Sequence, residues 1–118
     1  MREIIFRGKR VDTGEWAESE YPYGTMSCGV VRHNFNHDTI GQFTGLTDKN
    51  GVKIFEGDIV KTYDPDDSPA IVVYDESETQ YGIVIDNIYY CLGEHFRGID
   101  LEVIGNIHDN PELIKDGD

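Results

Sequence analysis

Hydrophobic residues occur along this chain in short runs, which glycine, asparagine, aspartate and proline interrupt. β-Branched and aromatic residues fill these runs, and apolar positions at the spacing of a helix are nearly absent. Such a pattern is typical of short strands that are joined by tight turns. We therefore predict strands at positions 2–7, 40–46, 52–55, 58–63, 70–74, 81–85, 88–92 and 101–107.

The segments between the predicted strands carry turn and loop signals. Residues 12–14 (DTG) predict a turn that leads into an extended segment at 15–17. The stretch 19–38 is the least regular, and a strand resumes within it at 29–32. Residues 64–69 hold two prolines and three aspartates, which favour a loop because proline removes a backbone donor.

Two further connections have a more specific pattern. The polar stretch 75–80 separates the strands at 70–74 and 81–85, which predicts a hairpin with a long acidic connection. Near the end of the chain, Asn110 and Pro111 have the order of a helix start, with asparagine as the cap. A single helical turn is therefore expected there.

The stretch TGLTDKNGVKIFEGDIV in the middle of the chain concentrates three glycines and could be a ligand loop. A phosphate-binding loop of the GxxxxGK[ST] type needs lysine directly after its second glycine, and Val52 follows Gly51. A calcium loop that starts at Asp48 needs glycine where Lys53 stands and glutamate where Ile59 stands. Neither kind of ligand loop is therefore expected.

Backbone turns explain the same stretch. Asn50 and Gly51 both tolerate positive φ, so the chain can reverse tightly before the strand at 52–55. Gly57 permits a second sharp turn, and the Asp58 carboxylate can accept a hydrogen bond from a nearby backbone N–H. We predict two backbone corners around a short strand.

The charge balance is strongly acidic. The 118 residues include 23 acidic and 10 basic side chains, a net charge of −13. Because DNA-binding proteins place Lys and Arg against phosphates, direct binding to nucleic acid or to an anionic membrane is disfavoured. The charge favours a solvated surface, a basic partner, or a surface that imitates the phosphate backbone. Six of the carboxylates cluster in predicted loops: Asp64, Asp66, Asp67, Asp75, Glu76 and Glu78.

Cysteine usage and hydropathy indicate the compartment. Cys28 and Cys91 have no CxxC spacing, so two reduced thiols are expected, with one disulfide between them as the alternative. The first ten residues hold an apolar run of only three residues, and no segment approaches the length that spans a bilayer. We expect a soluble protein of the cytoplasm.

Two histidines are candidates for a metal site. His33 and His37 would share one face of a helix beside Asp38, and such a set can bind a metal. However, Asn34 and Asn36 favour loops, and no third ligand follows at a fixed spacing. We expect separate surface histidines, and we predict no metal and no other cofactor.

Residues 93–98 (GEHFRG) are a candidate for acid–base chemistry. They place Glu94, His95 and Arg97 between two glycines. A nucleophile would have to come from Cys91 or a remote serine, and nothing in the local sequence pairs one with the imidazole. We assign no catalytic residue, and an undetected small enzyme centred on this loop stays an alternative.

Three blocks of the sequence carry a resemblance to a known family. They are MREIIFRGKR at the start, IGQFTGLTDKNGVKIFEGDIV in the middle and LEVIGNIHDNPEL near the end. In this order and at these separations, the chain resembles the YopX family of small phage and prophage proteins. The resemblance implies a phage-encoded protein of the bacterial cytoplasm, with an SH3-like β-barrel and a tendency to self-associate. It implies no reaction and no catalytic residue.

We therefore predict a mainly β protein: a small SH3-like β-barrel with additional N-terminal strands and a short C-terminal helical turn. One domain would span 1–118, with the barrel core at about 40–108 and N-terminal strands and an irregular region at 1–39. The barrel strands would be 52–55, 58–63, 70–74, 81–85 and 101–107.

Our first hypothesis for the function is a non-enzymatic protein-interaction or self-assembly module that serves a phage as an accessory factor. It is motivated by a compact β domain with seven tyrosines and strand edges that a host or phage protein could contact. The alternatives are an acidic mimic of DNA that inhibits a host DNA-binding protein, and the undetected enzyme.

Overall fold

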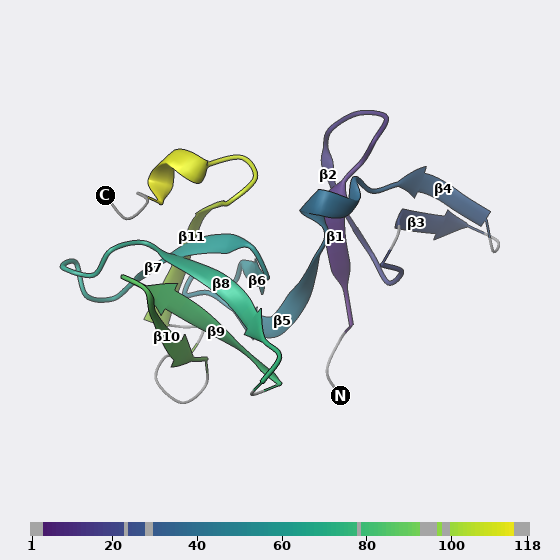
Figure 1. Cartoon of the computed structure of the whole chain (residues 1–118). Coiled ribbons are helices and arrows are strands. Elements are labelled where there is room, and N and C mark those ends of the chain that lie inside the picture. The colour runs from purple at the N-terminus through teal and green to yellow at the C-terminus, as the bar shows by residue number, and fades with distance from the viewer. Residues whose placement is uncertain are drawn as a thin grey trace. The chain divides into compact units, whose positions relative to one another are not determined.

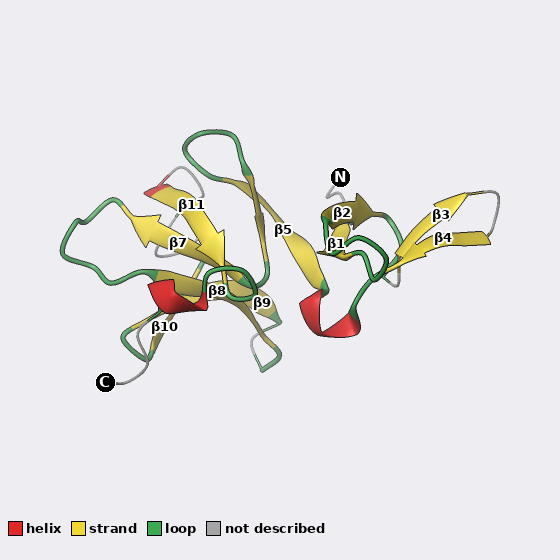
Figure 2. Cartoon of the chain, turned by 90° about the horizontal axis from the view of Figure 1, so that it is seen from above, coloured by secondary structure: helices red, strands yellow, loops and turns green. Residues whose placement is uncertain are grey.

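The structure is a computed structural model, which describes residues 4–22, 24–27, 30–77, 79–92, 97 and 100–114 (Figure 1). The chain divides into two compact units, Met1–Gly45 and Leu46–Asp118. Every strand pair with a described register is antiparallel. Figure 2 shows helix only as short segments among the strands. The prediction of a mainly β fold is confirmed.

The first unit is built on β1 (Phe6–Lys9), which pairs with two neighbours. These are β2 (Trp16–Ser19) and the start of β5 (Gly41–Thr47). A Cβ at Gly8 of β1 would lie only 2.6 Å from Cγ of Phe35. The glycine therefore lets this ring pack directly on the strand, and Phe35 is buried.

A two-stranded ribbon and a 3₁₀ turn complete the first unit. β3 (Gly24–Ser27) pairs with β4 (Val30–Asn34), and η1 (His37–Thr39) follows. The Thr39 hydroxyl accepts a hydrogen bond from the backbone N–H of Lys9 at 2.9 Å, which ties the turn to β1. The stretch predicted to be least regular thus holds two paired strands.

The second unit contains a five-stranded sheet in the order β10-β9-β8-β7-β11. Its strands are β7 (Asp58–Thr62), β8 (Ala70–Asp75), β9 (Gln80–Ile85), β10 (Ile88–Cys91) and β11 (Leu101–Asn106). β6 (Lys53–Phe55) lies beside β5 in a sheet of order β2-β1-β5-β6. Both glycine-rich corners flank β6.

The two faces of the five-stranded sheet differ in burial, because side chains alternate along each strand. One face contributes to the core of the second unit, which consists of Ile54, Val60, Ala70, Val72, Ile83, Ile85 and Leu101. The opposite face, called the outer face here, presents Ile59, Lys61, Ile71, Val73, Val84, Tyr89 and Glu102.

Asp48 organises the first predicted corner. Its Oδ1 accepts hydrogen bonds from the N–H groups of Asn50 (2.8 Å) and Val52 (2.9 Å). Its Oδ2 accepts from the N–H of Val103, 55 residues away, at 2.9 Å. Gly51 has a φ of 82°, as predicted, whereas Asn50 does not share the positive φ that was expected of both. One buried carboxylate therefore ties this turn to β11.

Gly57 and Asp58 form the second corner, between β6 and β7. Gly57 has a φ of 92°, and its N–H donates to the carbonyl of Val72 at 2.9 Å. The Asp58 carboxylate is 1% exposed and accepts from the N–H of Phe55 at 2.8 Å. The corner is confirmed, including the predicted carboxylate bond to the backbone.

A tight turn that was not predicted from the sequence joins β9 to β10. Asp86 and Asn87 have φ values of 51° and 70°, and Ile88 lies opposite Ile85. Positive φ at both residues of a two-residue loop is the mark of a type I′ hairpin turn. The strand predicted at 88–92 therefore pairs with its predecessor.

The predicted helical turn near the end of the chain is present as η3 (Pro111–Leu113), with Asn110 at the N-cap position and proline at the first helical position as predicted. The Asn110 side chain makes no capping hydrogen bond. Its Oδ1 instead accepts from the N–H of Asn106 at 3.3 Å, and it lies 2.6 Å from where a Cβ at Gly105 would stand. The Asn110 side chain thus packs the C-terminal turn against β11.

Two finer predictions stay predictions, namely closure into an SH3-like barrel and a single domain over 1–118. The predicted barrel includes the strand at 52–55, whereas β6 lies beside β5 and β10 joins the five-stranded sheet. The strand pairing therefore differs in these two places from the five barrel strands that the sequence predicted.

Candidate functional site

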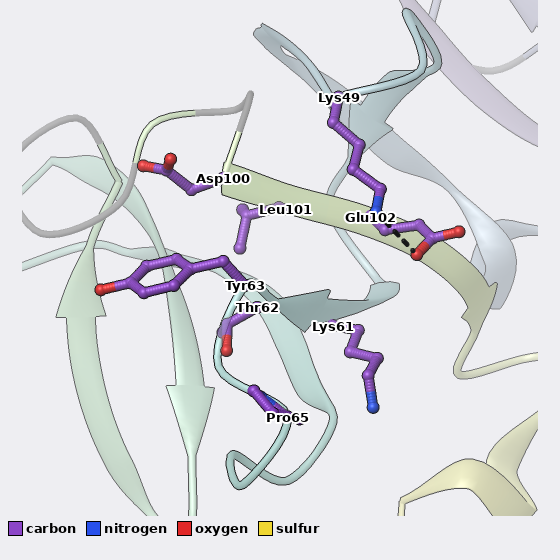
Figure 3. A pocket seen from close by; sticks show the side chains of 8 residues that line it. All are labelled: Lys49, Lys61, Thr62, Tyr63, Pro65, Asp100, Leu101 and Glu102. Atoms are coloured by element: carbon purple, nitrogen blue, oxygen red, sulfur yellow. Dashed lines mark ion pairs between the residues drawn. The ribbon is translucent and has the colours of Figure 1, made fainter.

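A hollow of about 240 Å³ opens on the second unit, where the end of β7 meets the start of β11 (Figure 3). β7 and the loop after it contribute four lining residues, the start of β11 contributes three, and the first corner contributes one. They are Lys49, Lys61, Thr62, Tyr63, Pro65, Asp100, Leu101 and Glu102.

The charges around the hollow are mixed. The ammonium of Lys49 lies 3.5 Å from Oε1 of Glu102, and Glu102 faces Lys61 across the β7–β11 pair. Asp100 accepts a hydrogen bond from the Arg97 N–H at 3.0 Å. That backbone bond, helped by the Arg97 guanidinium, holds the pKa of the Asp100 carboxyl below its usual range despite some burial. The acid therefore stays ionised near neutral pH.

One wall of the hollow is aromatic and held in place by the β7–β8 loop. Tyr63 is 74% exposed, and Figure 3 shows its ring between Asp100 and Thr62. The Thr62 hydroxyl donates to Oδ2 of Asp67 at 2.8 Å, which fixes the start of the loop. An exposed ring beside carboxylates and ammonium groups suits the binding of a peptide side chain.

The candidate metal residues do not form the set that a helix would have made. His33 lies on β4, and its side chain is outside the described part of the structure. His37 opens the 3₁₀ turn η1 and is exposed, as is Asp38. No helix places the two histidines on one face, and the described residues contain no group of potential metal ligands.

The candidate acid–base loop can be placed only in part. Glu94 and His95 lie outside the described residues, and Arg97 bonds to Asp100 through its backbone and its guanidinium. Cys91 is a free thiol whose Sγ accepts from Nε2 of Gln80 at 2.9 Å. Cys28 is outside the described residues, so the expectation of two reduced thiols stays a prediction.

Comparison with known proteins identifies the family. A family model described as YopX protein matches residues 6–115. The chain belongs to the YopX family. Among solved structures it is similar to protein EF1440 from Enterococcus faecalis, with a TM-score of 0.56 and 26% identity over 98% of this chain and 100% of that chain. A search of curated proteins finds no match.

Neither the name of the family nor the name of the similar protein from Enterococcus faecalis states an activity. The function of this YopX protein is therefore argued from its surface. Helices that are long and apolar enough to cross a membrane are absent from the described residues.

Acidic charge is concentrated in the second unit of this YopX protein. Met1–Gly45 holds five basic and six acidic residues, a net charge of −1. Leu46–Asp118 holds five basic and seventeen acidic residues, a net charge of −12. Almost all of the negative charge thus belongs to one unit.

The predicted acidic loops precede and follow β8. In the first loop, Oδ1 of Asp64 accepts from the N–H of Asp66 at 2.9 Å. In the second, Oδ1 of Asp75 accepts from the N–H of Ser77 at 3.0 Å, and Glu76 is exposed. Glu78 lies outside the described residues. A six-residue strand separates the loops by about 20 Å, so the carboxylates form two groups rather than one.

The sequence did not predict which residues line the hollow. Tyr63 was included only as one of the seven tyrosines that motivated a protein-interaction module. Lys61 and Glu102 are far apart in the chain, and only the register of β7 with β11 brings them together. No local pattern reports such a pairing. The one available signal was an aromatic residue directly before a proline-rich loop.

Proposed function

We propose that this YopX protein is a phage or prophage accessory protein that acts in the bacterial cytoplasm as a non-enzymatic protein-interaction module. The supporting observation is that the second unit carries a net charge of −12 together with exposed apolar side chains. Tyr63 is 74% exposed and Ile88 is 55% exposed. A basic partner gains Coulomb attraction from the charge and apolar contact from these side chains.

We also propose how the chain is organised and that it self-associates. The five-stranded sheet and β6 share one apolar core, which is compatible with an SH3-like barrel at about 40–108 inside one domain spanning 1–118. β10 forms one edge of the sheet, and sheet edges are common sites of association between copies. We therefore expect the protein to self-associate. Because of its negative charge, we expect it to bind neither nucleic acid nor membranes directly.

The test is affinity capture of partners from bacterial lysate with the tagged full chain. Capture is carried out at about 0.1 M and about 1 M NaCl, between which the Debye length falls from about 10 Å to about 3 Å. We expect a protein with a basic surface to be retained at low salt and largely released at high salt. Absence of any partner above background at both salt concentrations would overturn the proposal.

Two variants with equal charge loss locate the contact. One neutralises four exposed acids of the second unit, and the other neutralises four exposed acids of the first unit. The substitutions are Asp66→Asn, Glu76→Gln, Asp86→Asn and Glu112→Gln in the former, and Glu15→Gln, Glu18→Gln, Glu20→Gln and Asp38→Asn in the latter. Only the former is expected to lose the partner.

The acidic mimic of DNA is a second candidate, and the charge of the second unit favours it. A mimic occupies the DNA-binding surface of its target, so duplex DNA and the protein compete for the same site. Adding duplex DNA to the capture should then release the partner in proportion to its affinity for DNA. A partner that stays bound under saturating DNA would exclude the DNA mimic and would be consistent only with the protein-interaction module.

A further inference from the structure

Part of the outer face of the five-stranded sheet carries a partly exposed apolar strip. Ile71, Val84 and Tyr89 lie side by side across β8, β9 and β10, and Val73 follows on β8. All four side chains are half-buried although they point away from the core. We call these four residues the outer strip.

The tyrosine of the outer strip lies flat on the sheet. The ring of Tyr89 occupies the space above Gly82, where a Cβ would otherwise stand. The Tyr89 hydroxyl donates to the carbonyl of Gln80 at 3.3 Å. The glycine and this bond hold the ring as a fixed apolar surface.

The outer strip continues a row that the chain itself covers at its other end. Ile59 is the register neighbour of Ile71 and is 0% exposed. Gly105 lies opposite Ile59, and Asn110 and Leu113 lie within 3.0 Å of where a Cβ at Gly105 would stand. The C-terminal turn therefore covers the outer face at β7 and β11, while the outer strip on β8 to β10 stays half-exposed.

The charged side chains of the strands and loops around the outer strip are acidic, and Lys61, a basic residue of the outer face, lies at its far end on β7. Residues 62–92 contain seven acidic residues and no Lys, Arg or His. Asp86 in the β9–β10 turn lies at the same end of the sheet as the β7–β8 loop, and Asp75 and Glu76 lie at the opposite end of β8. The strip is thus an apolar centre with carboxylates at both ends.

We propose that the outer strip binds a protein segment with an apolar centre and Lys or Arg residues on both sides. This inference rests on the proposed function and specifies its partner. Apolar contact over the strip would supply affinity, and the carboxylates at the two ends would select basic flanks and fix their direction.

The same charges argue against other occupants. A second copy that docked by the same face would bring the carboxylates at the ends of the two strips near one another, and like charges repel. Nucleic acid and anionic lipid are repelled for the same reason. A basic protein segment is the class of partner that gains from both the apolar and the charged parts of this surface.

The test is selection from a library of random twelve-residue peptides on the immobilised full chain, with the tag alone as the background. We expect enrichment of peptides that have apolar residues in the centre and Lys or Arg on both sides. Synthetic copies of these peptides should bind the wild-type chain in solution, and their affinity should fall as salt is raised.

Matched variants then locate the binding surface. Val73→Thr combined with Val84→Thr keeps the β-branched shape but makes the strip polar, and it should weaken peptide binding about tenfold or more. Val52→Thr, at an exposed valine outside the five-stranded sheet, should leave binding unchanged. Asp86→Asn with Glu76→Gln should weaken binding and reduce its salt dependence, and asparagine suits the positive φ at position 86.

Several results would overturn the inference. They are no enrichment over the tag, enrichment of peptides without basic flanks, or equal binding to the wild type and to a folded double-threonine variant. If the double-threonine variant still captured a lysate partner, the proposed function would hold, but a surface other than the outer strip would bind that partner. Peptide binding without any lysate partner would instead overturn the proposed function alone.

Discussion

Asp48 is a buried carboxylate whose ionised form is stabilised by backbone N–H groups. Burial by itself raises the pKa of this carboxyl, but the N–H groups of Val103, Val52 and Asn50 together outweigh burial and lower the pKa. The pKa of an aspartate in an unfolded chain is about 3.9. The unfolded state therefore takes up the proton first as the pH falls. The stability from this group is complete above about pH 5 and is lost as the pH drops through the lower, folded pKa.

Asp48→Asn should destabilise the protein at neutral pH by about 1–3 kcal/mol. The amide oxygen can still serve Asn50 and Val52, but the amide NH₂ cannot accept from Val103, so a donor loses its partner. Urea unfolding at pH 7 measures the loss. The same urea unfolding at lower pH tests whether the loss comes from the ionised carboxylate. The difference in the free energy of unfolding between wild type and variant should narrow below about pH 4.

The matched control for this prediction is Asp38→Asn, at an exposed aspartate of the first unit. It should change stability by no more than the error of the measurement. Equal losses in both variants, or a gap for Asp48→Asn that stays constant into acid, would contradict the role assigned to the carboxylate.

At the scale of elements, the sequence predicted what local chemistry determines. Gly57 and Asp58 predicted their corner because both act on the backbone within a few residues. The strands at 70–74 and 81–85 predicted a hairpin because alternation and turn residues are local signals. The bond from Val103 to Asp48 was missed, since it joins residues that are 55 positions apart. The hollow at β7 and β11 was missed for the same reason.

The prediction for Asn110 is confirmed in its position at the N-cap of η3, but its side chain makes no capping hydrogen bond. Asparagine before proline favours a helix cap, but its side chain can also accept from other backbone donors. Here the nearby strand end supplies such a donor, the N–H of Asn106. The local preference for a capping bond was therefore outweighed by packing against β11.

Gly57→Val tests the corner between β6 and β7. A Cβ there would lie 3.8 Å from its nearest neighbours in Ile107 and His108, which is ordinary contact, so the cost comes from the φ of 92°. That conformation costs a residue with a Cβ about 1–2 kcal/mol, and the melting temperature should fall by roughly 3–10 °C. Thermal unfolding followed by circular dichroism measures the change.

Gly57→Asn is the matched control, because asparagine tolerates positive φ better than valine does. It should lose clearly less stability than the valine variant. An unchanged melting temperature for Gly57→Val would contradict the corner, and equal losses in both variants would assign the cost to space rather than to φ.

At the scale of the whole molecule, the uneven distribution of charge affects stability as well as binding. A net charge of −12 in Leu46–Asp118 makes these residues repel one another in the compact state. Met1–Gly45, with a net charge of −1, has no comparable repulsion. Salt should therefore stabilise the protein chiefly through its second unit.

Raising NaCl from about 0.01 M to about 1 M shortens the Debye length from about 30 Å to about 3 Å, so the melting temperature should rise. The variant with four acids neutralised in the second unit should melt higher than the wild type at low salt and gain less from added salt. The variant with four acids neutralised in the first unit should keep nearly the full salt response. Equal responses in the two variants would mean that the repulsion is not concentrated in the second unit, and the attraction proposed for a basic partner would lose its physical basis with it.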